Sequence, residues 1–169
     1  MKKIISFMMI SLILGLFGVN AFAFDLSADF TDSEYGYSIK YPSDWYSKIN
    51  RSGMVLADIN SKDNSAGLQI RLTHSNKSLD AYIQNYIVQF ERDMQADIIS
   101  QEYLIIDSRN AYTISFKANR GNKDYFLLSY IIPANKSASF FIFQAGVPYG
   151  MRNQIVPVLD AIACSFEMN

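Results

Sequence analysis

Cysteine and histidine each occur only once, and their scarcity excludes several kinds of site. Cys164 alone cannot form an intramolecular disulfide, so stability must come from packing. Together with His74 it cannot supply the ligands of a structural zinc centre. Cys164 also lies far from the N-terminal region, where a lipid-bearing cysteine would stand, so no stable membrane anchor is expected. Because its neighbours are mostly apolar, we expect Cys164 to be a small buried side chain.

Runs of basic residues are missing too. The chain has 15 Lys and Arg against 16 Asp and Glu, and the basic residues are not interleaved with aromatic ones. This balance excludes a nucleic-acid-binding surface and gives no reason to expect attraction to anionic lipid.

The known signatures of catalysis are absent as well. There is no Gly-x-Ser-x-Gly nucleophile elbow and no glycine-rich phosphate loop, and the acidic residues form no obvious pair. His74 lies at the end of an expected strand and is interpreted as a solvated side chain. The loop from Asp58 to Asn64 has calcium-type oxygens, but Lys62 and a missing glycine favour an ordinary polar turn. We therefore expect no enzyme activity, no cofactor and no metal.

The first 23 residues have the pattern of a secretory signal peptide. Lys2 and Lys3 precede an apolar run from Ile4 to Val19, and Ala21-Phe22-Ala23 follows as a small-residue cleavage site. We expect cleavage before Phe24 and a periplasmic or secreted protein. Residues 24–169 are short enough to form a single domain.

Alternating apolar residues predict a mainly antiparallel sheet. Strands are expected at residues 35–41, 45–49, 54–59 and 68–72, and then in four consecutive segments, 98–106, 111–118, 125–132 and 139–145. The connections between these last four segments are short enough for hairpins. Segments 125–132 and 139–145 are apolar on both faces, which predicts central strands covered on both sides.

Two helices are expected to provide that cover. Apolar residues recur every three or four positions from Leu79 to Met94, and Ser78 is placed to cap the first turn. A second apolar stripe runs from Tyr149 to Ala163. Pro157 interrupts it, so we expect either a kink or a helix that begins near Val156. The predicted class is α+β, with helices on both faces of the sheet.

The segment Tyr37-Ser38-Ile39-Lys40-Tyr41-Pro42-Ser43-Asp44-Trp45 resembles the opening signature of PsbP-like domains. Ser165-Phe166, after the last predicted helix, is similar to the closing Ser-Phe of that family. The resemblance covers nearly all of residues 24–169 and implies an antiparallel sheet between helices. The family includes photosystem-associated lumenal proteins, bacterial envelope proteins of the DcrB type and a nuclear small-GTPase-binding relative, which implies a binding or assembly module.

Aromatic residues near the start of the domain are the candidate binding patch: Tyr35, Tyr37, Tyr41 and Trp45. Such residues are enriched in interface hot spots, although core packing would also explain them. The leading hypothesis is an exported, non-enzymatic module that binds an unknown protein partner through a sheet edge or this patch. The alternative is a small apolar ligand, or a lipid, held in a pocket lined by Tyr and Phe between sheet and helix.

Overall fold

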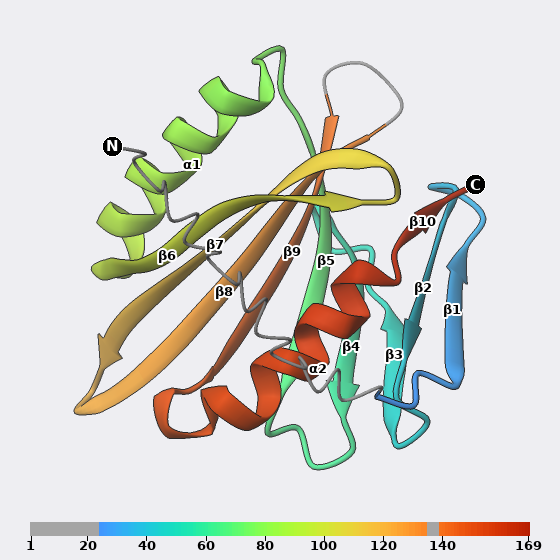
Figure 1. Cartoon of the computed structure of the whole chain (residues 1–169), viewed down its shortest axis with the longest axis horizontal. Helices are drawn as coiled ribbons and strands as arrows, with labels where there is room; N and C mark the ends of the chain where they lie inside the picture. Colours follow the sequence, from blue (N-terminus) through green and yellow to red (C-terminus); the bar gives the residue numbers. More distant parts are fainter. Residues whose placement is uncertain (1–23, 135–138) are drawn as a thin grey trace, which may run out of the picture.

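A seven-stranded antiparallel sheet is the centre of the computed structural model, which describes residues 24–134 and 139–169 (Figure 1). The predicted signal peptide, residues 1–23, lies outside the described residues. The strand order is β3–β4–β5–β9–β8–β7–β6. The strands are β3 (Trp45–Ile49), β4 (Val55–Ser61), β5 (Gly67–His74), β6 (Ala96–Ile106), β7 (Arg109–Arg120), β8 (Lys123–Pro133) and β9 (Ser139–Pro148). The apolar strands β8 and β9 are central, as their sequence predicted.

Short hairpins join β6 to β7 and β7 to β8. In the first, Asp107 and Ser108 both have positive φ, 48° and 60°. In the second, Gly121 and Asn122 have φ of 57° and 68°. Two consecutive left-handed residues give the twist that suits a two-residue hairpin, so both predicted turns are confirmed. The turn between β8 and β9 includes residues 135–138, which lie outside the described part.

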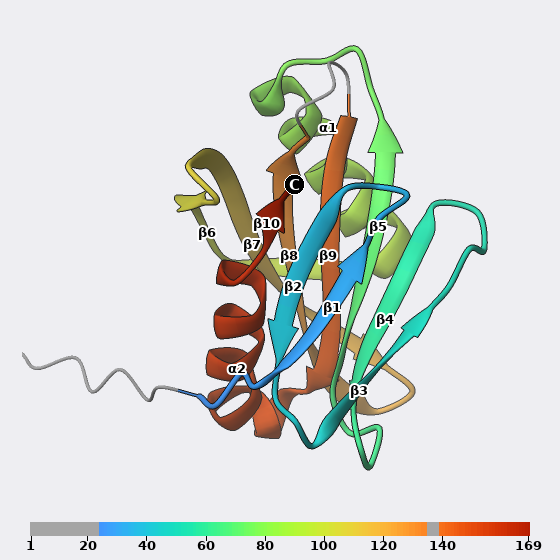
Figure 2. The same cartoon turned by 90° about the vertical axis from the view of Figure 1, so that its right-hand side faces the viewer.

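Three further strands form a separate small sheet that the sequence did not foresee. Its order is β1–β2–β10, from β1 (Ala28–Asp32), β2 (Tyr37–Tyr41) and β10 (Glu167–Met168). It lies in front of the large sheet in Figure 2 and packs on the same face as the C-terminal helix. The Tyr-Pro signature therefore ends a strand of this small sheet, and β3 of the large sheet begins at Trp45.

The two predicted helices cover opposite faces of the large sheet. α1 (Leu79–Met94) begins after Ser78, whose hydroxyl accepts from the Ala81 amide at 3.3 Å, as predicted. α2 (Arg152–Cys164) follows a short 3-10 turn, η1 (Tyr149–Met151). None of the helices in the two described ranges is both long and apolar enough to cross a membrane.

Two findings concern the C-terminal region. Of the two alternatives for Pro157, a helix that begins near Val156 is excluded, because α2 begins at Arg152 and Pro157 lies inside it on its exposed side. There, water can bond the carbonyl group that loses its helical partner. Cys164 is exposed rather than buried, because the buried stripe of α2 consists of Leu159, Ile162 and Ala163.

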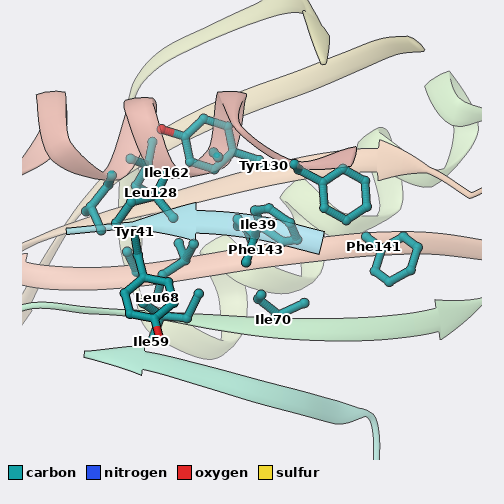
Figure 3. Close-up of a cluster of buried hydrophobic side chains, with 14 of the residues drawn as sticks. Ile39, Tyr41, Ile59, Leu68, Ile70, Leu128, Tyr130, Phe141, Phe143 and Ile162 are labelled. Carbon is teal, nitrogen blue, oxygen red and sulfur yellow. The ribbon is translucent and has the colours of Figure 1, made fainter. Parts of the chain in front are cut away.

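The sheet divides the interior into two hydrophobic clusters. The α2-face core lies between the large sheet, the small sheet and α2, and includes Ile39, Leu68, Phe143, Ile162 and Phe166 (Figure 3). The α1-face core lies between the sheet and α1, and includes Ile83, Ile87, Ile114, Phe116 and Ile142. The predicted arrangement of an antiparallel sheet with helices on both faces is confirmed.

Candidate functional site

The structure disperses the four aromatic residues predicted as a patch. Tyr37 is 0 % exposed and Tyr41 is 8 % exposed, and both belong to the α2-face core. Tyr35, before β2, and Trp45, at the start of β3, are half-buried. The alternation of side chains along β2 turns Tyr37 and Tyr41 inward. Of the four predicted residues, only Tyr35 and Trp45 therefore present surface to a partner, and they lie beyond opposite ends of β2.

Tyr37 has an unusual environment for a tyrosine. Its ring packs against Phe30, Phe141 and Phe166, with ring centroids 5.2 to 6.0 Å apart. Its hydroxyl group is buried and has no hydrogen-bond partner among the described residues. Burial raises the pKa of Tyr37, and the nearby Asp32 carboxylate adds to this effect. Tyr37 is therefore a neutral core residue.

His74 lies where its sequence position predicted, exposed at the end of β5. Its Nδ1 is 2.7 Å from the Oγ of Ser139, which is its cross-strand neighbour on β9. Both line a hollow of about 450 Å³ that also includes Glu34. Glu34 pairs with Arg51 at 3.4 Å, and within the described ranges no carboxylate bonds to the imidazole. Among the described residues, His74 and Ser139 therefore have no acidic group that would orient a catalytic histidine.

The loop considered for calcium is a polar turn at the end of β4. Asp63 accepts hydrogen bonds from the backbone amide of Ser65, the Ser61 hydroxyl and the Ser65 hydroxyl. These bonds stabilise the carboxylate and lower the pKa of Asp63 to about 2. In the part of the chain that the structure describes, no three His, Cys, Asp or Glu side chains are grouped as metal ligands.

The β6 edge is the most exposed apolar feature of the large sheet. β6 is the last strand in the order, and residues 97–103 are all exposed. Four of its apolar side chains, which we call the β6 edge, are between 37 % and 65 % exposed: Ile98, Ile99, Tyr103 and Ile105. The Tyr103 hydroxyl donates to Asp80 on α1 at 2.6 Å, which connects this strand to the helix.

The helix adds to the same surface. α1 and β6 run in opposite directions and only Gln95 separates them in the chain. Val88 is 62 % exposed and lies roughly 9 Å before the end of α1. In a strand, the same length corresponds to about three residues, counted from the start of β6. Val88 therefore lies near the level of Ile98 and Ile99 and adds an exposed apolar side chain on α1.

A cavity opens at the other side of α1, over β5 and β9. Its volume is about 480 Å³, within the usual size range of ligand sites. We call it the α1 cavity; its lining includes Met54, Arg71, Tyr82, Tyr86, Phe90, Met94 and Gln144. The rings of Tyr86 and Phe90 stack with centroids 5.4 Å apart, and Tyr82 stacks on Phe140 at 4.4 Å. Three aromatic rings of α1 therefore line the cavity.

A hydrogen-bonded chain of polar groups crosses the floor of the α1 cavity. Nη1 of Arg71 donates to Oε1 of Gln144 at 2.8 Å, and Nε2 of Gln144 donates to the Tyr86 hydroxyl at 2.7 Å. That hydroxyl lies 2.7 Å from the Oγ of Ser129. Burial raises the pKa of Tyr82 and of Tyr86, so both phenols are neutral donors at neutral pH.

Only partial signals for these two surfaces are present in the sequence. The segment 98–106 was predicted as a strand, but its apolar residues did not reveal that it would be exposed at an edge. Arg71 belongs to the polar alternation of Gln69, Arg71 and Thr73, which is typical of a solvated strand face. A pocket lined by Tyr and Phe between sheet and helix was the alternative hypothesis, but no local pattern indicated that Arg71 would lie in it.

Two comparisons of the sequence with known proteins gave different results. The family model described as PsbP matches residues 26–168, nearly the whole described chain. No curated protein matches the sequence.

Solved structures share the fold at low sequence identity. Cyanobacterial PsbP (CyanoP) from Synechocystis has a TM-score of 0.67 at 16 % identity, over 84 % of this chain and 92 % of its own. LpqN, described as involved in cell envelope biogenesis of Mycobacterium tuberculosis, has a TM-score of 0.62 at 10 % identity, over 84 % and 90 %. The Saccharomyces cerevisiae Ran-binding protein Mog1p has 0.58 at 8 % identity, over 83 % and 94 %. At such identities the similarity concerns the fold alone.

Proposed function

Because the chain belongs to the PsbP family, we propose that it is an exported, non-enzymatic module that binds an extended segment of a protein partner along β6. The observation that carries this proposal is the long, exposed and apolar outer edge of β6. The leader-like residues 1–23 support export and favour a periplasmic or secreted location.

The backbone of β6 supports strand addition. β6 has 11 residues, and β7 is its only neighbour in the sheet, among the strands of the described residues. The amide and carbonyl groups that point away from β7 can therefore pair with another strand. The exposed side chains of the β6 edge would then give specificity through alternate contacts.

The opposite edge of the sheet is better protected. β3 has only five residues and includes Lys48, and both a short edge strand and a lysine discourage pairing with other chains. β6 is more than twice as long and contains no Lys, Arg or Pro. It does contain a bulge between Ile98 and Ser100, so the regular edge is limited to residues 100–106.

Charge indicates what kind of segment would fit. β6 contains two exposed acidic residues, Asp97 and Glu102, and Asp80 of α1 lies beside Tyr103. A partner segment with alternating apolar and basic residues would bury its apolar side chains and complement these carboxylates. Two copies of β6 would instead bring acidic residues together, which favours a different protein over a second copy.

Site-specific photo-crosslinking in the native host tests this proposal. Benzoylphenylalanine replaces Ile105, which is 65 % exposed on β6, or Ile49, which is 58 % exposed on β3. We expect irradiation to give a discrete protein adduct from position 105 and none from position 49. The added substitution Ile99→Lys should remove the adduct, because a charged side chain would enter the apolar contact.

The controls separate binding from misfolding. Ile99→Lys and the matched Ile49→Lys both change exposed side chains, so each should alter the free energy of unfolding by less than about 0.5 kcal/mol. Equal adducts from positions 105 and 49 would contradict a specific β6 interface. An adduct made only of two copies of this chain would indicate that β6 mediates self-association and does not bind a different protein.

The alternative function, small-molecule binding, is favoured by one observation, the aromatic α1 cavity of about 480 Å³. Native mass spectrometry of protein purified from its own host would test it directly. A retained small molecule whose mass is lost on denaturation would support this alternative, and a bare polypeptide mass would count against it.

A further inference from the structure

Arg71 is a half-buried cation in the α1 cavity, and no described residue is its acidic partner. Ion pairs join Arg51 to Asp32, Arg92 to Asp93 and Arg109 to Asp107. Within residues 24–134 and 139–169, by contrast, no carboxylate lies within 4 Å of Arg71. Its one described hydrogen bond uses Nη1 and the neutral Gln144 side chain. A guanidinium has five N–H donors, so most of them remain for a ligand.

The other charges near the α1 cavity do not neutralise Arg71. Asp93 also lines the cavity, but its Oδ1 is 2.9 Å from Nε of Arg92. The phenols of Tyr82 and Tyr86 are neutral because burial raises the pKa of each. The floor of the cavity therefore has a positive potential, which favours an anion.

The walls near Arg71 favour an apolar body attached to that anion. Tyr82 and Phe90 present aromatic rings, and Met54 presents a flexible thioether. Met94 also lines the cavity, and its sulfur accepts from Nη2 of Arg120 at 2.9 Å. Met54 is held over β5 because its carbonyl oxygen accepts from the Leu72 amide at 2.9 Å. Its side chain is 51 % exposed, so it lies at the open side of the cavity.

From this geometry we propose that the α1 cavity binds a small organic carboxylate with an apolar body. The planar guanidinium of Arg71 takes the carboxylate, a pairing that its forked donors suit better than a lysine would. Gln144 holds the guanidinium in place, and the rings of Tyr82 and Phe90 contact the apolar body. The proposal specifies the ligand of the small-molecule alternative and is independent of the β6 edge.

Methionine-methyl NMR with two matched probes tests this site. Octanoate and 1-octanol have the same tail length and differ in charge. In protein labelled with 13C at the methionine methyl groups, octanoate should shift the Met54 and Met94 signals. Met151, before α2, and Met168, in the hollow of about 450 Å³ near His74, should not move. 1-Octanol should bind more weakly at the same two methionines.

Variants assign the effect to the guanidinium. Arg71→Gln should weaken octanoate binding by roughly 10- to 100-fold, the range for a charged hydrogen-bonding group, and leave 1-octanol binding unchanged. Arg71→Lys, which keeps the charge and loses the fork, should give intermediate affinity. Lys40→Gln, on the exposed side of β2, removes the same charge and should change nothing.

Three outcomes would overturn the proposal. These are unshifted Met54 and Met94 signals at millimolar octanoate, undiminished binding by Arg71→Gln, or shifts confined to Met168. Equal affinity for octanoate and 1-octanol would overturn carboxylate recognition while leaving small-molecule binding in place. If Arg71→Gln does not fold, as judged by its thermal unfolding, the comparison of Arg71→Lys with the native protein decides the result.

Discussion

The two faces of the large sheet are covered very differently. On one face, α2 and the small sheet together close the α2-face core, in which Phe166 contacts the rings of Tyr37, Phe141 and Phe143. On the other face, α1 is the helix that packs on the sheet, and the α1 cavity lies beside it over β5 and β9. The heavier cover of the α2 face buries the larger of the two hydrophobic clusters, whereas the lighter cover of the other face leaves Arg71 and Gln144 in the lining of a cavity.

The polarity of the strands follows this difference. On β5, Leu68 and Ile70 point into the α2-face core, while Gln69 and Arg71 lie on the α1 side. A helix laid fully over that side would bury an unpaired arginine, which would cost several kcal/mol. The sequence of β5 therefore suits a face that stays partly open to water or to a ligand.

Truncating one phenylalanine on each face is the strongest test of this comparison. Phe166→Ala should lower the free energy of unfolding by about 3 to 5 kcal/mol, because Phe166 is 1 % exposed in the α2-face core. Phe90→Ala should cost only about 1 to 2 kcal/mol, because Phe90 is half-buried beside the α1 cavity. Urea unfolding of the two variants measures both values, and equal losses would contradict unequal cover.

Removing a hydroxyl from the well-covered face should have a smaller effect of the opposite sign. Tyr37→Phe should raise the free energy of unfolding by about 1 kcal/mol, since it deletes a buried hydroxyl without a described partner and keeps the ring. In the same core, the hydroxyl of Tyr130 donates to Asp160 on α2. Tyr130→Phe should therefore lower stability. Thermal unfolding measures both variants, and a loss of stability in Tyr37→Phe would indicate an unseen partner.

A change in the turn after β4, outside both cores, should have the smallest effect and depend on pH. The pKa of Asp63 in the folded protein is about 2, below its unfolded value near 3.8. Its contribution to stability is therefore complete above pH 4 and is lost as the pH falls toward 2. Asp63→Asn should be slightly less stable than the native protein at pH 7 and equal to it near pH 2. Urea unfolding at these two values measures this, and a constant difference would exclude the carboxylate as the cause.

Much of the fold could be predicted because its signals are local. The apolar period from Leu79 to Met94 and the cap at Ser78 specified α1 to the residue. The hairpins after β6 and β7 followed from short polar connections, and the apolar character of β8 and β9 indicated central strands. The partition into two sheets was not predictable, because nothing local distinguishes the strand ending at Tyr41 from the one beginning at Trp45.

The candidate sites were harder to predict, since exposure depends on neighbours. Tyr37 and Tyr41 were chosen for their residue type, and their alternation along β2 turns both inward. Segment 98–106 was predicted as a strand, but nothing in it indicated that the sheet would end there. Cys164 has apolar neighbours in sequence, but its place on α2 turns it outward.

The sequence by itself determined the positions of the two helices and most strands, the antiparallel pairing and the family resemblance, because periodicity and turn chemistry act over a few residues. Only the tertiary structure decided which strand is the edge, which aromatic residues are buried and that Arg71 lies beside Tyr82 and Phe90. Those features depend on contacts between segments far apart in the chain, and no short stretch of sequence specifies them.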